Sequence, residues 1–211
     1  MNCTLIFELQ SYWHAGTGRG AGAVVDAVIH RDPSGLPELP GKTVRGLVRN
    51  AVQLGVAAGV VTEAQELEWF GSRLPEVLAL QPNESSESDT EATLEEARFR
   101  TVAGVLWFGT ATLPAAWRAF AAGGSMEATE HVAELTRHLA STAIGEDGLA
   151  KEHTLRVREV AFPMELRATV IGPDDDTWQG AISRCLPFLR ALGSRRQRGY
   201  GRVDVRWERA P

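Results

Sequence analysis

The amino-acid sequence predicts an α+β domain built around an antiparallel sheet. Segments with the alternation, or the β-branched and aromatic content, of strands occur near both ends of the chain, and helical segments are few. This strand-rich order is typical of an antiparallel sheet, and no internal repeat at a fixed period is present. With 211 residues, the chain is long enough for one domain that carries a substantial insertion.

The first part of the chain is predicted to be mostly extended. Residues 3–9 mix β-branched, aromatic and alternating polar positions, as a strand does. A glycine-rich loop, GTGRGAG, follows at 16–22, and residues 23–30 form a second extended segment with Asp26 in its middle. Residues 32–35, DPSG, predict a turn, in which Asp32 can accept hydrogen bonds from the backbone that follows it.

Two helices are predicted next. Residues 42–60 place apolar side chains at helical spacing, and a shorter helix covers 62–70. Within the first helix, Lys42, Arg45 and Arg49 stand at positions i, i+3 and i+7. Because residues three and four apart are neighbours on a helix, we expect these three cations to share one face.

The second half of the chain is predicted to contain further strands and helices. The clearest strand signal is the alternation over 154–171, which Pro163 interrupts, so a long hairpin arm or two strands in series are both expected there. The other predicted elements are a strand at 99–108, a helix at 127–140, a helix at 177–192 and a strand at 202–207.

Charge is distributed unevenly along the chain. The net charge is −5, but residues 81–97 carry six acidic and no basic residues, so the balance without them is −5 + 6 = +1. This acidic stretch is poor in aromatic residues, and we expect 73–98 to be a flexible acidic insertion. Arginines cluster instead near the C-terminus. The sequence thus predicts a localised basic face on an acidic protein.

The chain carries no sign of a membrane or secretory segment. No run of 18 apolar residues is present, and the N-terminal MNCTLIFELQ lacks a basic start followed by a long apolar centre. We therefore expect a cytoplasmic protein without a membrane partner.

The loop GTGRGAG formally fits the dinucleotide-binding pattern Gly-x-Gly-x-x-Ala. That motif requires a helix directly after it, whose N-terminus meets the pyrophosphate. The residues that follow here, AVVDAVIH, are typical of a strand. A flexible loop near a binding surface, with Arg19 as a candidate contact, is the better interpretation.

The stretch LPGKTVRGLVRN contains Gly41-Lys-Thr at the start of a helix, as a nucleotide-binding P-loop does. A P-loop also requires a glycine five residues before Gly41, and this position is Leu36. Pro37 and Pro40 stand where backbone N–H groups would hold the phosphates, and proline has no N–H. The sequence therefore argues against an NTPase.

The same helix start remains suited to a phosphate from another source. Its free N–H groups and dipole attract an anion. The candidate contacts are Lys42, Thr43, Arg45 and Arg49.

The C-terminal loop GSRRQRGYGRV, 193–203, has the composition of a single-strand RNA-binding loop. Its glycines allow close approach of the backbone, its arginines can contact phosphates, and its tyrosine offers a face for a base. The candidate residues are Arg195, Arg196, Arg198, Gly199, Tyr200 and Gly201.

At this point the sequence resembles the RAMP proteins of CRISPR systems. GLPELPGKTVRGLVRNA is similar to the proline-glycine turn that opens their first helix, and GSRRQRGYGRV is similar to their C-terminal glycine-rich loop. WHAGTG with VVDAVIHRDPSGLPELPGK is most like the repeated backbone subunit of type III effector complexes. WFGS and TLRVREVAFP also resemble segments of that subunit, the second following its β-hairpin thumb.

The resemblance implies a ferredoxin-like (RRM-like) core over 1–211, with a helical insertion and a thumb-like hairpin at about 141–165. It implies that copies assemble along a guide RNA with other CRISPR-associated subunits in antiviral defence. It also implies an endoribonuclease that cuts the paired target RNA at regular intervals with a divalent metal such as Mg²⁺. Asp26 stands at the matching position for the catalytic and metal-binding carboxylate, while Asp32 is better interpreted as a turn former.

Two alternatives remain open from the sequence. The chain could be a non-cleaving scaffold or capping subunit of the same kind of complex, because one carboxylate is not by itself a nuclease signature. Processing of the guide RNA would need a general base, for which His14 is the nearby candidate. His14 could also lie near bound RNA, although a structural role beside Trp13 is the simpler interpretation.

Overall fold

The computed structural model of the chain describes residues 1–22, 24–72 and 101–208. The acidic insertion expected at 73–98 lies outside the described residues. Among the helices that the structure describes, none has both the length and the apolar composition needed to span a bilayer.

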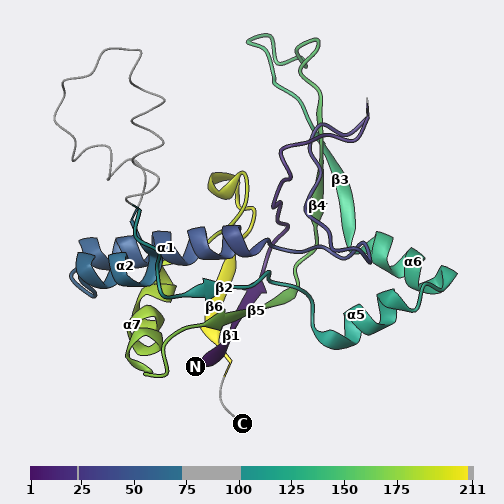
Figure 1. Cartoon of the computed structure of the whole chain (residues 1–211). Helices are drawn as coiled ribbons and strands as arrows, with labels where there is room; N and C mark the ends of the chain where they lie inside the picture. Colours follow the sequence, from purple (N-terminus) through teal and green to yellow (C-terminus); the bar gives the residue numbers. More distant parts are fainter. Residues whose placement is uncertain (23, 73–100, 209–211) are drawn as a thin grey trace, which may run out of the picture.

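The main sheet has four strands in the order β2-β5-β1-β6, and each neighbouring pair is antiparallel (Figure 1). Along the chain its elements follow the order β1-α1-β2-β5-α7-β6, which is the βαββαβ arrangement of a ferredoxin-like core. The strands are β1 (Asn2–Leu9), β2 (Trp107–Phe108), β5 (Glu165–Ile171) and β6 (Val203–Trp207). The helices are α1 (Gly41–Ala57) and α7 (Thr177–Cys185).

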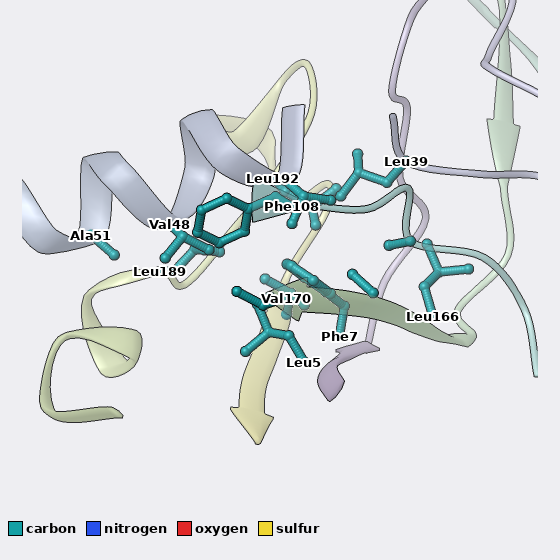
Figure 2. Close-up of a cluster of buried hydrophobic side chains, with 14 of the residues drawn as sticks. Leu5, Phe7, Leu39, Val48, Ala51, Phe108, Leu166, Val170, Leu189 and Leu192 are labelled. Carbon is teal, nitrogen blue, oxygen red and sulfur yellow. The ribbon is translucent and has the colours of Figure 1, made fainter. Parts of the chain in front are cut away.

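The hydrophobic core lies between one face of this sheet and the two helices. Alternate residues of β1 and β5, such as Phe7 and Leu166, are fully buried in the same cluster as Val48 of α1 (Figure 2). Trp178 and Ile182 of α7 complete the cluster. Each large side chain buried in this way contributes about 1.5–3 kcal/mol, so this layer of packing fixes α1 firmly against the sheet.

Helix α1 begins where the sequence predicts it and packs closely at its start. Pro40 is the N-cap, and its carbonyl accepts the amides of Thr43 and Val44 at 2.8 and 3.0 Å. A Cβ at Gly41 would lie 2.5 Å from the carbonyl oxygen of Phe108, so only glycine allows the helix to approach the β2 strand this closely.

Helix α2 (Glu63–Phe70) confirms the short helix expected at 62–70. Thr62 and Gln65 form a capping box at its start, and Gly71, with φ of 69°, ends it. This end of α2 lies against α1, where both Trp69 and Phe70 are buried.

A second, two-stranded sheet forms a hairpin that extends away from the main sheet (Figure 1). It consists of β3 (Thr136–Ser141) and β4 (Arg156–Ala161), paired from Thr136 with Ala161 to Ser141 with Arg156. Two short helices, α5 (Ala115–Ala122) and α6 (Met126–Glu134), precede the hairpin and pack on each other. The alternating stretch 154–171 is thus two strands in series, β4 and β5, separated at Pro163 as one of the two predictions states.

The strand predicted at 99–108 is wrong over most of its described length. Only Trp107 and Phe108 join the sheet. The amides of Val105 and Leu106 instead donate to the carbonyls of Glu68 and Trp69, at 3.0 and 3.2 Å. The end of α2 therefore satisfies these amides and keeps the segment away from β5.

Two predicted helices are shorter than expected. The helix at 127–140 ends at Glu134, and residues 136–141 pair with β4 instead of continuing the helix. The helix at 177–192 ends at Cys185, and Leu186–Phe188 forms a 3₁₀ turn. Pro187 has no N–H to continue the α-helical bonding.

Candidate nucleic-acid interface

Three segments that carry candidate residues meet at one end of the main sheet. The last residue of β1, Leu9, pairs with the first residue of β6, Val203, and Glu8 pairs with Glu165 at the start of β5. One end of the sheet is therefore joined to three segments: the one after β1, the loop before β6 and the hairpin before β5. Figure 1 shows all three extending from this end of the sheet.

The base of the glycine-rich loop, residues 193–201, is attached to the segment that follows β1. The amide of Ser194 donates to the carbonyl of His14 at 3.0 Å, and the amide of Gly201 donates to the carbonyl of Tyr12 at 2.7 Å. Gly201 has a φ of 67°, and a Cβ there would lie 1.9 Å from the carbonyl oxygen of Leu192. Glycine at this position is therefore required by both the backbone angle and the close approach.

The tip of this loop presents arginines to solvent. Residues 196–198 form a 3₁₀ turn between two left-handed residues, Arg195 and Gly199, with φ of 58° and 82°. Arg196 and Arg198 are exposed, and neither forms an ion pair with any residue that the structure describes. Together with Ser194, these residues line a hollow of about 480 Å³.

Arg195 and Tyr200 lie deeper in the loop. Both side chains are half-buried, and Arg195 Nη2 donates to Ser141 Oγ of β3 at 3.2 Å. The loop therefore lies against the hairpin at the end of β3. This contact links two segments that are 54 residues apart in the sequence.

Asp26 is aligned along the edge of β4. Its amide donates to the carbonyl of Val157 at 2.8 Å, and its carboxylate Oδ2 accepts the amide of Val157 at 2.7 Å. The side chain remains exposed. One carboxylate oxygen is thus fixed by the backbone, and Oδ1 has no hydrogen-bond partner within the described ranges.

The ring of His14, which the sequence suggested as a residue near bound RNA, is buried. It is 5% exposed, and Nδ1–H donates to the carbonyl of Glu159 at 2.6 Å. Burial lowers the pKa of His14, and the positive charge of Arg158 lowers it further, while the hydrogen bond and the charge of Glu159 act in the opposite direction. His14 is a neutral structural group that joins the segment after β1 to β4.

The Glu159 side chain also joins β4 to the segment after β1, through bonds to Ile29 and Arg31. Its Oε2 accepts the amide of Ile29 at 3.0 Å, and its Oε1 accepts Nη2 of Arg31 at 2.6 Å. Arg31 also donates to Thr136 Oγ1 at 2.8 Å. The segment that carries Asp26 is therefore held against β4 by both backbone and side-chain bonds.

The predicted basic face of α1 is only partly present. Lys42 is exposed and Thr43 is half-buried at the helix start. Arg49 is 8% exposed, pairs with Glu66 and donates to the carbonyl of Gly71 at 2.8 Å. Its guanidinium is bonded to residues at the end of α2, which covers this part of α1.

Arg45 is likewise directed toward α2. Its guanidinium donates to the carbonyl of Phe70 and lies 6.0 Å from the centre of the Phe70 ring. Burial lowers the pKa of Arg45, and the nearby charge of Arg49 lowers it further. The structure thus leaves Lys42, rather than a row of three cations, open to a ligand at this end of α1.

Two further sequence predictions concern loops. Arg19 is exposed in the glycine-rich segment 16–22, where Ala21 and Val25 pair with each other and no helix follows. Asp32 Oδ1 accepts the amides of Ser34 and Leu36 at 2.8 and 3.0 Å, which confirms it as a turn former.

Sequence reasoning missed one residue of this region, Arg158. It follows an alternating pattern in β4, where a polar residue is expected to face solvent, yet its side chain is half-buried beside the Asp26 segment. Only the pairing of Ala27 with Arg158 brings the two together. Nothing in the spacing of these residues, more than 130 apart, indicates that contact.

The sequence model of the RAMP superfamily matches residues 6–204. The chain belongs to the RAMP superfamily. No curated protein sequence matches the chain.

Solved structures share the fold of this RAMP protein. A chain in the cryo-EM structure of Type III-B Cmr-beta bound to cognate target RNA has 12% identity and a TM-score of 0.60, covering 98% of this chain and 97% of that chain. A chain in the apo-state structure of Type III-B Cmr-beta has 10% identity and a TM-score of 0.61, with the same coverage. These likenesses confirm the α+β prediction with its antiparallel, ferredoxin-like core.

Proposed function

We propose that this RAMP protein is an RNA-binding subunit of a CRISPR effector complex of type III, in which it holds the guide RNA. The observation that carries the proposal is the loop 193–201, whose exposed Arg196 and Arg198 have no acidic partner in the described part of the chain. Its fold, shared with a chain of Type III-B Cmr-beta bound to cognate target RNA, supports the proposal.

The guide RNA is held mainly through its phosphates. Arginine guanidinium groups suit phosphate oxygens, and glycine positions such as Gly199 leave the backbone open to a close approach. Lys42 at the start of α1 adds one more cation, and Tyr200 supplies an aromatic ring beside the arginines. Partners of the chain are then the guide RNA, the target RNA, further copies of the chain and other CRISPR-associated subunits.

We propose further that Asp26 takes part in cutting the target RNA at regular intervals along the duplex. Its carboxylate is exposed and is oriented by the amide of Val157, so it can accept a hydrogen bond from an attacking 2′-hydroxyl at a fixed position.

The site around Asp26 fits only a metal ion that needs few protein ligands. In the described residues, no group of three or more His, Cys, Asp or Glu side chains is placed to hold a metal. Mg²⁺ is often bound through one or two carboxylates, with waters and phosphate oxygens as its other ligands, so the free oxygen of Asp26 suits it. When bound, Mg²⁺ supplies positive charge that stabilises the reacting phosphate.

The alternative is a non-cleaving scaffold or capping subunit. It is favoured by one observation: His14, the candidate general base named from the sequence, is buried and bonded to Glu159. A target-cleavage assay on the assembled complex, with and without a chelator of divalent metal, distinguishes the two functions. Metal-dependent cutting at regular intervals supports the nuclease, and intact target bound by the complex supports the scaffold.

RNA binding itself is tested with the purified chain. Binding of a fluorescent single-stranded RNA is measured by anisotropy between about 50 and about 200 mM salt, and we expect the logarithm of the association constant to fall linearly with the logarithm of the salt concentration. Affinity that does not change with salt contradicts the proposal.

A further inference from the structure

Arg158 lies where the Asp26 segment pairs with β4. Ala27 and Arg158 form a parallel bridge, and the amide of Glu159 donates to the carbonyl of Ala27 at 2.9 Å. On its other side, Arg158 pairs with Leu139 of β3. Its position is therefore fixed by the same backbone that fixes Asp26.

The guanidinium of Arg158 has no hydrogen-bond or ion-pair partner among the residues that the structure describes. Its Nε is buried and makes no hydrogen bond, and no carboxylate in the described ranges pairs with it. A buried donor on a charged group is costly when it remains unsatisfied. Such a group in a native protein requires an explanation, and an absent ligand is one.

Arg158 also lies close to the loop 193–201, because the His14 carbonyl accepts the amide of Ser194 at 3.0 Å and the His14 ring donates to the carbonyl of Glu159, the residue after Arg158, at 2.6 Å. Burial lowers its pKa, and the positive charge of Arg195 lowers it further, while Tyr200 and Asp26 act in the opposite direction. Arginine nonetheless stays protonated at neutral pH. Two cations that repel each other at a half-buried position attract an anion between them.

A second unsatisfied group lies in the same loop. Ser194 Oγ is buried without a hydrogen-bond partner, and Ser194 lines the hollow of about 480 Å³ together with Arg195. A hydroxyl is a donor that a phosphate oxygen can accept from.

We propose that Arg158 and Arg195, with Ser194 at the base of the loop, form an anion-binding site that takes one phosphodiester group of RNA beside Asp26. The RNA part of this inference rests on the proposed function. The site explains why β4 carries an arginine whose Nε has no hydrogen-bond partner among the described residues.

Arg158→Met tests the site, because methionine keeps an unbranched chain while removing the charge. Arg156→Met is the matched control: it is on the same strand, is exposed, and loses the same charge. Without added anions, we expect R158M to melt at the same temperature as the unaltered chain or higher, because it removes an unpaired charge. A purely structural role for Arg158 predicts a lower melting temperature instead, and this result would overturn the inference.

The anion is tested with inorganic phosphate against chloride at equal ionic strength. We expect phosphate to raise the melting temperature of the unaltered chain and of R156M, but not of R158M. Arg158→Lys retains a charge without the Nε–H donor, and we expect a smaller rise than in the unaltered chain. An equal rise in R158M and the unaltered chain contradicts the site.

RNA binding then separates this inference from the proposed function. We expect R158M to bind single-stranded RNA about tenfold more weakly, the loss typical of charge-assisted hydrogen bonds, and R156M to stay within about twofold of the unaltered chain. If the unaltered chain binds RNA and R158M binds it equally well, the site is wrong and the function stands. If phosphate stabilises only chains with Arg158 but no RNA binds, the anion site stands and the proposed function is wrong.

Discussion

The carboxylate of Asp26 accepts the backbone amide of Val157 at 2.7 Å, while the amide of Asp26 donates back to the carbonyl of Val157 at 2.8 Å. These two bonds join an exposed acidic side chain to a strand that begins 130 residues later. They hold the carboxylate in one orientation, as a group that must meet a reacting atom requires.

Two substitutions of Asp26 should distinguish the effect of its charge on cutting from the effect of its hydrogen bond to Val157 on stability. In Asp26→Asn, the amide oxygen can still accept from Val157, so we expect unchanged stability but complete loss of target cutting by the assembled complex. In Asp26→Ala the bond is also lost, and the free energy of unfolding should fall by about 1 kcal/mol. Urea denaturation and a cleavage assay measure the two effects.

Asp32→Asn is the matched control for this loss of charge. Asparagine can keep the turn bonds to Ser34 and Leu36, so cutting by the complex should continue. If Asp26→Asn cuts as fast as the unaltered chain, Asp26 has no role in the reaction, and the scaffold function is favoured.

Arg49 should contribute to the stability of the fold and not to the affinity for RNA. Its side chain and that of Glu66 are only 10% and 12% exposed, so Arg49→Met removes a mostly buried ion pair together with the hydrogen bond to the carbonyl of Gly71. We expect a loss of about 3 kcal/mol in the free energy of unfolding, with the RNA affinity of the folded protein unchanged. Reduced RNA affinity at full stability would instead support the sequence-based expectation of a phosphate contact.

His14 should make the protein less stable in acid. Burial, the largest influence, holds its folded-state pKa below the unfolded value of about 6.5, so the unfolded state binds a proton first as the pH falls. Its contribution to stability is thus present above about pH 6.5 and is lost as the pH falls through the folded-state pKa.

His14→Asn isolates this contribution, because asparagine can still donate a hydrogen bond to Glu159 but does not titrate. We expect the melting temperature of this variant to change less between about pH 7.5 and about pH 5 than that of the unaltered chain. His138→Asn, an exposed histidine on β3, is the control and should retain the full pH dependence. Equal pH dependence in all three proteins contradicts the assignment.

Local patterns were enough to predict the elements that form the core of the fold. Period-two alternation and turn residues identify β1, β4, β5 and β6, and helical spacing identifies α1 and α2. The failures occur where tertiary contacts compete with local preference. Residues 136–141 become a strand because β4 is available as a partner, and residues 101–106 bond to the end of α2.

The sequence suggested some residues of the candidate site, but not how they are arranged. Composition identifies the arginine loop, and the resemblance to RAMP proteins identifies Asp26, because both are contiguous motifs. Helical spacing places Arg49 on a basic face, but it cannot show that α2 covers that face. The half-buried position of Arg158 beside the Asp26 segment depends on contacts between segments far apart in the chain, which no local pattern encodes.

The most direct test of the account is the salt dependence of RNA binding in a loop variant. Arg196→Ala combined with Arg198→Ala should make the slope of log affinity against log salt shallower by about 1.4, since each single-strand phosphate contact contributes about 0.7. The control, Arg118→Ala combined with Arg184→Ala, removes the same charge from exposed positions on α5 and α7 and should leave the slope unchanged. RNA binding by the loop 193–201 would be contradicted if the loop variant kept the slope of the unaltered chain. It would also be contradicted if the control variant lost as much slope as the loop variant.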